Sequence, residues 1–323
     1  MGCAAAGRPR AAAGGCGVSV VVVRAAAGDE WDAVAAWAQR VGTLLAAGLE
    51  PLAAVRAVEH PALGAEAANV ESAYEVPDRL LAAAQRAPDS TGRAWALLAA
   101  YWVVAIESGA PLAAALDRVA DSLRALADAD RQIDLAIAGP ISTARIVALL
   151  PLLGLGMGLL IGANPLAVLF GTVPGAVAGA GGAALLFAGA RWNRRLVAAA
   201  RRYDPLAGSG SELLALALAS GGTPERASAL VAATADRCGL AVALADAHET
   251  LAFAKRSGIP VAALLRADAA RLRRVALAAV LRQAALLGSR LLAPLGLCFL
   301  PAFVLWGVVP LVIGILRGVL ASF

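Results

Sequence analysis

The positions of the charged residues divide the chain into apolar and polar blocks. Residues 146–190 contain no Asp, Glu, Lys or Arg, and residues 291–316 form a second charge-free run. One helical pass through a bilayer needs about 20 apolar residues, so the first run fits two passes and the second fits one. Asn164-Pro165 and the Gly/Pro-containing stretch 171–175 mark a turn inside the first run. The pattern predicts membrane-spanning helices near 146–167, 173–190 and 291–316.

The remaining apolar runs are too short to cross a membrane alone. Residues 94–106 are uncharged, but 13 helical residues reach only about 20 Å. In the polar block before the first span, apolar residues recur with helical period and predict an amphipathic helix over about 112–137. The residues on its apolar face are Leu112, Leu116, Val119, Leu123 and Leu126.

Composition supports a helical membrane protein. Hydrophobic residues make up 60% of the 323 positions and charged residues 16%, against about 25% charged in an ordinary soluble domain. Aromatic residues are only 5%, so Ala, Leu and Val supply the excess, and Ala and Leu favour helix. The expected fold class is an all-α membrane protein with three transmembrane helices. Residues 1–30 are Ala- and Gly-rich and are expected to form a flexible tail.

Arginines next to the charge-free runs predict the orientation in the membrane. They are concentrated on the side of the two polar segments, and the turn between the first two spans carries no charge. Because Lys and Arg are enriched in cytoplasmic loops, both polar segments are expected in the cytoplasm and the turn and C-terminus outside. The arginines on the polar-segment side are Arg145, Arg191, Arg194, Arg195, Arg201, Arg202, Arg282 and Arg290, and Arg317 alone follows the third span.

The two polar segments, residues 31–145 and 191–290, resemble each other. Gly48 is followed three positions later by Pro51, and Gly221 in the same way by Pro224. Further on, Ser108-Gly109-Ala110-Pro111 matches Ser257-Gly258-Ile259-Pro260. The two offsets are 221 − 48 = 173 and 258 − 109 = 149, so the first segment carries 24 more residues, which we place within 60–92. The order predicts a duplicated helical-bundle domain, each copy followed by a span.

Each Gly–Pro pair is expected to form a sharp corner between two helices. Gly readily takes the left-handed conformation that ends a helix. Pro is tolerated at the first position of the next helix, where no N–H is needed. Thr223, with Pro224 and Glu225 after it, has the pattern of an N-cap and an acidic first turn.

The stretches 39–52 and 106–112, QRVGTLLAAGLEPL and IESGAPL, resemble the opening helix and second corner of the type II secretion system F-domain family. These are inner-membrane platform proteins of type II secretion, type IV pili and tight-adherence pili. The resemblance covers roughly 31–318, with domains at 31–145, 146–190, 191–290 and 291–318. It implies a non-enzymatic, homo-oligomeric platform. Its implied partners are a cytoplasmic secretion ATPase, pilin-like subunits and other inner-membrane assembly proteins.

Candidate contact residues follow from the same motifs. Gln39 and Arg40 open the first motif, and Glu107 and Glu249 stand at comparable places before the second corners. All four are candidates for contact with the ATPase, whereas the alternative for the two glutamates is local capping, a salt bridge or a cation site. Segment 31–145 has 9 basic and 14 acidic residues (−5), and segment 191–290 has 15 and 7 (+8). This asymmetry indicates either attraction between the copies or contact of the second copy with anionic lipid.

Other function classes lack their motifs. The chain has no GxxxxGK[ST] phosphate loop, HExxH or GxSxG motif, and its cysteines form no CxxC pair, so no catalytic residue, cofactor or metal is expected. The basic clusters lack interleaved aromatics, which argues against a nucleic-acid partner. A small oligomeric transporter and an uncharacterised membrane scaffold remain alternatives. A transporter usually places ionisable groups inside its spans, and these spans have none.

Overall fold

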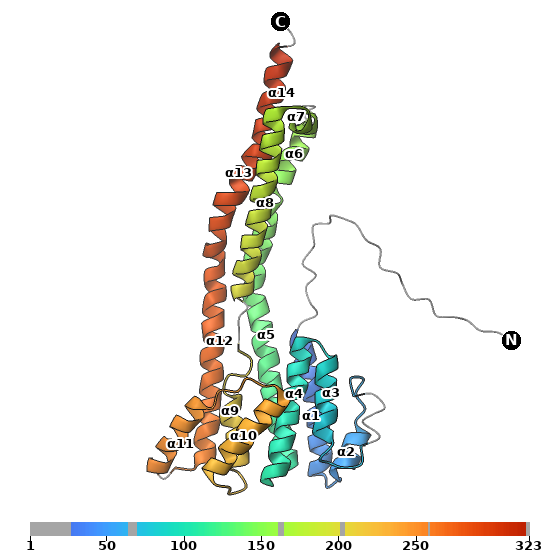
Figure 1. Cartoon of the computed structure of the whole chain (residues 1–323), viewed down its shortest axis with the longest axis vertical. Helices are drawn as coiled ribbons and strands as arrows, with labels where there is room; N and C mark the ends of the chain where they lie inside the picture. Colours follow the sequence, from blue (N-terminus) through green and yellow to red (C-terminus); the bar gives the residue numbers. More distant parts are fainter. Residues whose placement is uncertain (1–26, 64–69, 161–164, 201–203, 258, 321–323) are drawn as a thin grey trace, which may run out of the picture.

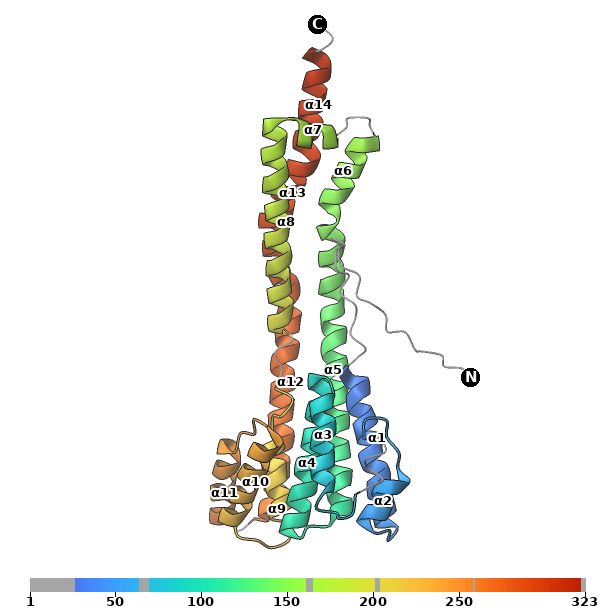
Figure 2. The same ribbon diagram turned by 45° about the vertical axis from the view of Figure 1, so that its right-hand side comes forward.

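The computed structural model of the protein describes residues 27–63, 70–160, 165–200, 204–257 and 259–320, and every regular element in these ranges is a helix (Figure 1). A broad bundle of short helices lies at one end, and long helices rise from it (Figures 1 and 2). Helix α1 (Ala27–Ala46) includes the last four residues, 27–30, of the predicted tail. Asp29 and Glu30 form an acidic first turn, which favours helix at this point. Residues 1–26 and Gly258 lie outside the described residues.

The first polar segment folds into five helices. After α1 come α2 (Pro51–Ala57), α3 (Val76–Arg86), α4 (Asp89–Ser108) and α5 (Leu112–Ala148). Helices α1 and α5 are antiparallel, as polar contacts from Trp31 to Asp130 and from Gln39 to Arg124 show. The short apolar run within α4 is buried without a break from residue 94 to 105. This run is therefore a core helix, consistent with its insufficient length for a span.

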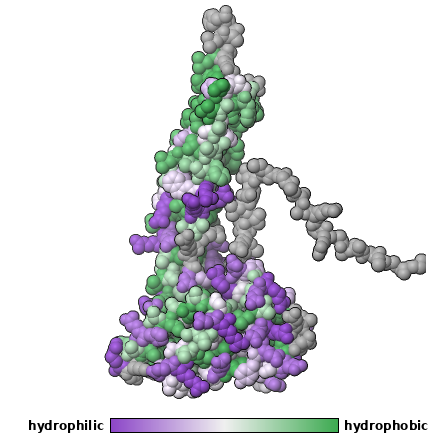
Figure 3. All heavy atoms as spheres, in the orientation of Figure 1, coloured by the Kyte–Doolittle hydropathy of each residue, from purple (hydrophilic) through white to green (hydrophobic). Residues whose placement is uncertain are grey.

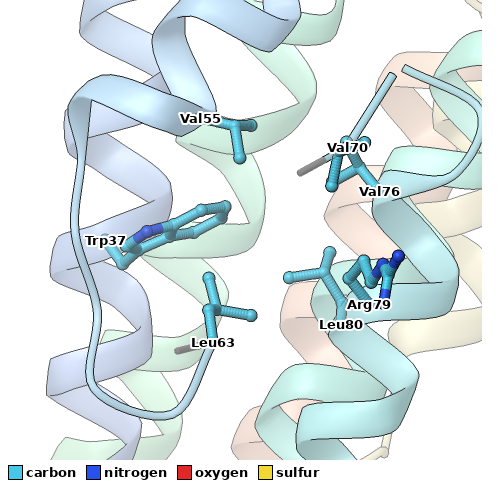
Figure 4. Close-up of a pocket in the computed structure, with 7 residues that line it drawn as sticks. All are labelled: Trp37, Val55, Leu63, Val70, Val76, Arg79 and Leu80. Carbon is cyan, nitrogen blue, oxygen red and sulfur yellow. The ribbon is translucent and has the colours of Figure 1, made fainter. Parts of the chain in front are cut away.

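Tryptophans fill the centre of this bundle. Trp37 and Trp95 meet edge to face with ring centroids 5.8 Å apart, and His60 packs on Trp95 at 4.9 Å. The indole N–H of Trp37 donates to the Val58 carbonyl at 2.9 Å, and that of Trp102 donates to Ala73 at 3.0 Å. These bonds tie the irregular chain between α2 and α3 to the core. Figure 4 shows Trp37 and α3 residues around a cavity of about 10 Å³, room for a single water molecule.

The second polar segment forms four helices beside the first. They are α9 (Ser209–Ala217), α10 (Pro224–Cys238), α11 (Ala245–Ser257) and α12 (Val261–Pro294). Helices α9 and α10 pack against α4, and α12 packs against α5. The buried apolar residues of both segments form one continuous cluster, from Trp31 to Leu265. The two segments thus share a hydrophobic core.

Three helices are long and apolar enough to cross a membrane: Leu112–Leu160, Val173–Ala200 and Val261–Gly314. They comprise α5 continuing into α6 (Leu150–Leu160), α8 (Val173–Ala200), and α12 continuing upwards. Apolar residues dominate the upper part of the visible face, whereas polar residues cover the bundle (Figure 3). The first span is described as far as Leu160, and Pro165 begins a separate short helix, α7 (Pro165–Gly171), inside the predicted range 146–167. The predicted domain boundaries at 145, 190 and 290 fall inside continuous helices.

The third span changes its helical pitch twice. The π-helical turns η2 (Leu295–Phe299) and η3 (Val304–Val308) flank α13 (Leu300–Phe303), and α14 (Val309–Leu320) follows. A proline ring clashes with the carbonyl four residues before it. For Pro301 and Pro310 these carbonyls belong to residues 297 and 306, one inside each π turn. The wider turns accommodate the prolines within a nearly continuous helix.

Candidate functional site

The Gly–Pro corners gather at the end of the bundle opposite the apolar helices (Figures 1 and 2). Gly48, Gly109 and Gly221 have φ of 94°, 73° and 88°, the left-handed values that end α1, α4 and the segment after α9. Helix α5 has 37 residues, which corresponds to about 55 Å. The corners therefore lie tens of ångströms from the start of the spans. We call this end of the molecule the base.

The prolines start the helices that leave these corners. Pro51 and Pro224 are the first residues of α2 and α10, and the Thr223 hydroxyl accepts from the Arg226 N–H as an N-cap. Pro111 and Pro260 stand at the N-caps of α5 and α12, one position before the first residues of these helices. Each proline is placed where it costs no backbone hydrogen bond.

The four candidate ATPase-contact residues lie on three helices. Gln39 and Arg40 are exposed on α1, and Gln39 accepts a hydrogen bond from Arg124 of α5. Glu107 is exposed in the last turn of α4, and Glu249 is exposed on α11. Within the described residues, no hydrogen bond or ion pair joins these four side chains to one another. They form a dispersed set of accessible polar groups.

A buried polar cluster that the sequence reasoning missed lies between the two segments. Glu212 of α9 pairs with Arg273 of α12, and the Ser122 hydroxyl of α5 donates to Glu212 at 3.0 Å. Arg273 also donates to Ser122 at 3.1 Å. The side chains of Glu212 and Arg273 are 12% and 20% exposed, so most of their surface is removed from water. The cluster therefore joins α9, α12 and α5 through charge-assisted hydrogen bonds.

Tyr101 of α4 brings a fourth helix to this cluster. Its side chain is fully buried, and its hydroxyl lacks a hydrogen bond of normal geometry. Burial, followed by the negative charge of Glu212, raises the pKa of Tyr101 well above its ordinary value. The hydroxyl therefore stays protonated at neutral pH. Arg118 of α5 is within electrostatic range of Glu212.

A second polar contact joins the segments at the surface. Arg237 at the end of α10 donates to Asp78 of α3 at 2.7 Å. An open groove beside it runs between the α3–α4 turn and the end of α10. This pair matches a carboxylate of the first segment with an arginine of the second, in agreement with the opposite net charges of the two segments. Such an exposed pair contributes orientation more than stability.

Weak signals for the buried cluster are present in the sequence. Glu212 is the single charged residue in the run 205–224, and Tyr101 places a hydroxyl group in the uncharged run 94–106. A polar group in an apolar helix indicates a buried partner. The partners of Glu212 are Arg273 and Ser122, which lie 61 and 90 positions away in the sequence, and no local pattern connects them.

The fold is an all-helical assembly with three candidate membrane spans, the architecture of a membrane-anchored helical protein. Residues 37–160 match the model of the family Type II secretion system (T2SS), protein F. The matched range runs from the middle of α1 to the end of α6, so the chain contains a T2SS protein F domain in its first segment and first span. No curated protein and no solved structure matches the chain. Among the described residues, no group of three or more His, Cys, Asp or Glu side chains is arranged to hold a metal ion.

Proposed function

We propose that this protein is an inner-membrane platform that couples a cytoplasmic secretion ATPase to the assembly of pilin or pseudopilin subunits. The observation that carries the proposal is the T2SS protein F domain at 37–160. The family is one of non-enzymatic platform proteins, and the three apolar helices supply the membrane anchor that this role requires. In this arrangement both polar segments are cytoplasmic, and the 164–175 turn and the C-terminus are outside.

The second segment is proposed to be a second copy of the F domain. Helices α1, α4 and α5 pack on one another in the first segment, and α9, α11 and α12 do so in the second. Helix α3 lacks a counterpart and falls in the 60–92 region, where we placed the 24 additional residues. The proposed domains are 31–145 and 191–290, with spans at 146–190 and 291–318.

The register of α5 and α12 supports the duplication. Ser122 contacts Arg273, 151 positions later, and the β-carbon position of Gly154 lies 2.8 Å from Phe303, 149 positions later. The second pair of matching corners, at Gly109 and Gly258, is also 149 positions apart in the sequence. Two copies related by rotation about an axis along α5 and α12 would place equivalent residues at equal height. The packing thus agrees with the sequence repeat over both the bundle and the span.

The proposed mechanism is mechanical. Helices α5 and α12 each run from a corner at the base, through the shared core, to a span without a loop. Because a continuous helix is stiff over this length, a push by the ATPase on the base would displace or rotate the spans, which would guide the pilin helix. Arg40, Glu107 and Glu249 are proposed contacts with the motor, and other inner-membrane assembly proteins and a second copy of the chain are further proposed partners.

The test is co-purification of the full-length protein with the secretion ATPase of its own system. Reversing two base charges in Glu107→Lys/Glu249→Lys should weaken ATPase capture by at least several-fold. The matched control is Gln132→Lys/Gln283→Lys, which adds two lysines on exposed parts of α5 and α12 far from the base. The proposal fails if the wild-type protein captures no ATPase and its deletion leaves fibre assembly intact. Equal loss in both variants would remove the base as the contact surface.

A further inference from the structure

All three long helices carry arginines next to the ends of the charge-free runs. Three of them are on the lower part of α8, one is on α5 and one is on α12, and all five are exposed. We call these residues the arginine collar: Arg145, Arg191, Arg194, Arg195 and Arg290.

Helix packing places the collar within a narrow range of heights. A β-carbon added at Gly189 of α8 would lie 2.9 Å from Cys298 Cβ. A β-carbon added at Gly154 of α6 would lie 2.8 Å from the ring of Phe303. Because α8 descends beside the third long helix while α5 and α6 ascend beside it, these contacts set the register. At 1.5 Å per residue, the collar positions lie about 3 to 12 Å below the level of Cys298. Arg191 is the highest of them and Arg290 the lowest.

Acidic residues are absent from this part of the sequence. No Asp or Glu occurs between Asp134 and Asp204, or after Asp268. Asp268 precedes Arg290 by 22 residues, about 33 Å along α12. The positive charge of Arg191, Arg194, Arg195 and Arg290 is therefore not neutralised along α8 and the adjoining part of α12.

Exposed apolar side chains lie at the level of the collar and directly above it. Leu149 at the C-cap of α5 and Phe187 on α8 are 50% and 66% exposed above the collar, and Leu292 on α12 is 66% exposed within it. Trp192, which is 40% exposed, lies within the collar, where the amphipathic indole ring suits a membrane–water boundary. An apolar belt above a cationic ring matches the layering of acyl chains and headgroup phosphates.

We propose that the collar binds the phosphate headgroups of anionic phospholipids in the inner leaflet. Guanidinium groups form bidentate hydrogen bonds with phosphate oxygens, and basic side chains next to an anionic leaflet are attracted to it. The proposal rests on the membrane placement of the three spans, and it extends that placement by naming the lipid class. By binding these headgroups, the collar holds the bundle at a fixed height above the membrane. A movement of the base is then a movement relative to the membrane surface.

The test compares the full-length protein in nanodiscs of zwitterionic phosphatidylcholine with 0, 25 or 50% phosphatidylglycerol. We expect the thermal unfolding midpoint of the wild type to rise by several degrees across this series, and the rise to shrink at high salt. Arg191→Gln/Arg194→Gln/Arg290→Gln should abolish most of the rise. The control Arg40→Gln/Arg226→Gln/Arg256→Gln, which removes three exposed arginines of the bundle, should keep it.

Three outcomes would overturn the proposal. They are a wild-type midpoint independent of phosphatidylglycerol, an equal response of the two triple variants, and reproduction of the rise by inorganic phosphate in uncharged nanodiscs. If the collar triple variant does not fold, mass spectrometry of lipids retained by the wild type and the control decides. Enrichment of phosphatidylglycerol over its bulk fraction is then required. Because no ATPase is present, these results are independent of the ATPase-capture experiment.

Discussion

The buried pair of Glu212 and Arg273 provides the most discriminating prediction about the fold. Glu212→Gln keeps the size of the side chain but leaves Arg273 without its counter-charge. Breaking a buried ion pair costs about 3–5 kcal/mol when the remaining charge is fully buried. Arg273 keeps 20% exposure and can reach some water, so we expect a loss of about 3 kcal/mol in the free energy of unfolding.

The opposite substitution should cost less. In Arg273→Met, Glu212 keeps its hydrogen bond from Ser122 and the electrostatic attraction of Arg118. The double variant should be less destabilised than the sum of the single variants by at least about 1 kcal/mol, because the second substitution removes the charge stranded by the first.

Urea unfolding of the detergent-solubilised protein, followed by tryptophan fluorescence, measures these differences. The signal reports the bundle because Trp31, Trp37, Trp95 and Trp102 lie in its core. Asp121→Asn is the control. It breaks a surface pair in which the carboxylate side chain is 79% exposed, and it should cost less than about 1 kcal/mol. A Glu212→Gln loss no larger than that of the control, or strict additivity in the double variant, would refute the assignment of a coupled buried pair.

Three further variants test other parts of the structure. Gly182→Ala places a β-carbon 2.3 Å from the Trp306 indole, and this overpacking should cost about 1–3 kcal/mol and lower the thermal midpoint in detergent. Gly156→Ala is the control, because no atom lies within 4 Å of its β-carbon, and its midpoint should not fall. Equal midpoints of the two variants would contradict the packing of α8 on the third span. Gly109 has a φ of 73°, and a β-carbon added there would meet open space. Gly109→Ala should therefore lower the free energy of unfolding by about 1 kcal/mol through backbone strain alone, as measured by urea unfolding. An unchanged free energy of unfolding would exclude the left-handed corner. Burial lowers the pKa of His60 below its ordinary 6.5, so the unfolded chain takes up the proton first. Stability therefore falls as the pH drops from 6.5 through the folded-state pKa. The urea midpoint of His60→Gln should lose that part of the pH dependence, and an unchanged pH profile would contradict this assignment.

The long apolar helices show how far local pattern carries. The charge-free lengths of 146–190 and 291–316 predicted helices capable of crossing a membrane, and the structure has three of them. The π turns in the third helix were not predicted. A proline indicates that the pitch must change but does not determine how, since the neighbouring helices decide which backbone adjustment fits.

The sequence by itself determined the features that depend on neighbouring residues: the apolar lengths that form three long helices, and the Gly and Pro positions that turn the chain between helices. Their causes are local, namely the cost of charge in an apolar layer and the allowed backbone angles of two residue types. The tertiary structure alone decided that both polar segments share one core, that Glu212 meets Arg273, and that α5 and α12 lie in register. The polar contacts among them join residues 61 to 151 positions apart in the sequence. They form because each gives a buried group a partner, either a hydrogen-bonding partner for a polar group or a packing partner for an apolar one.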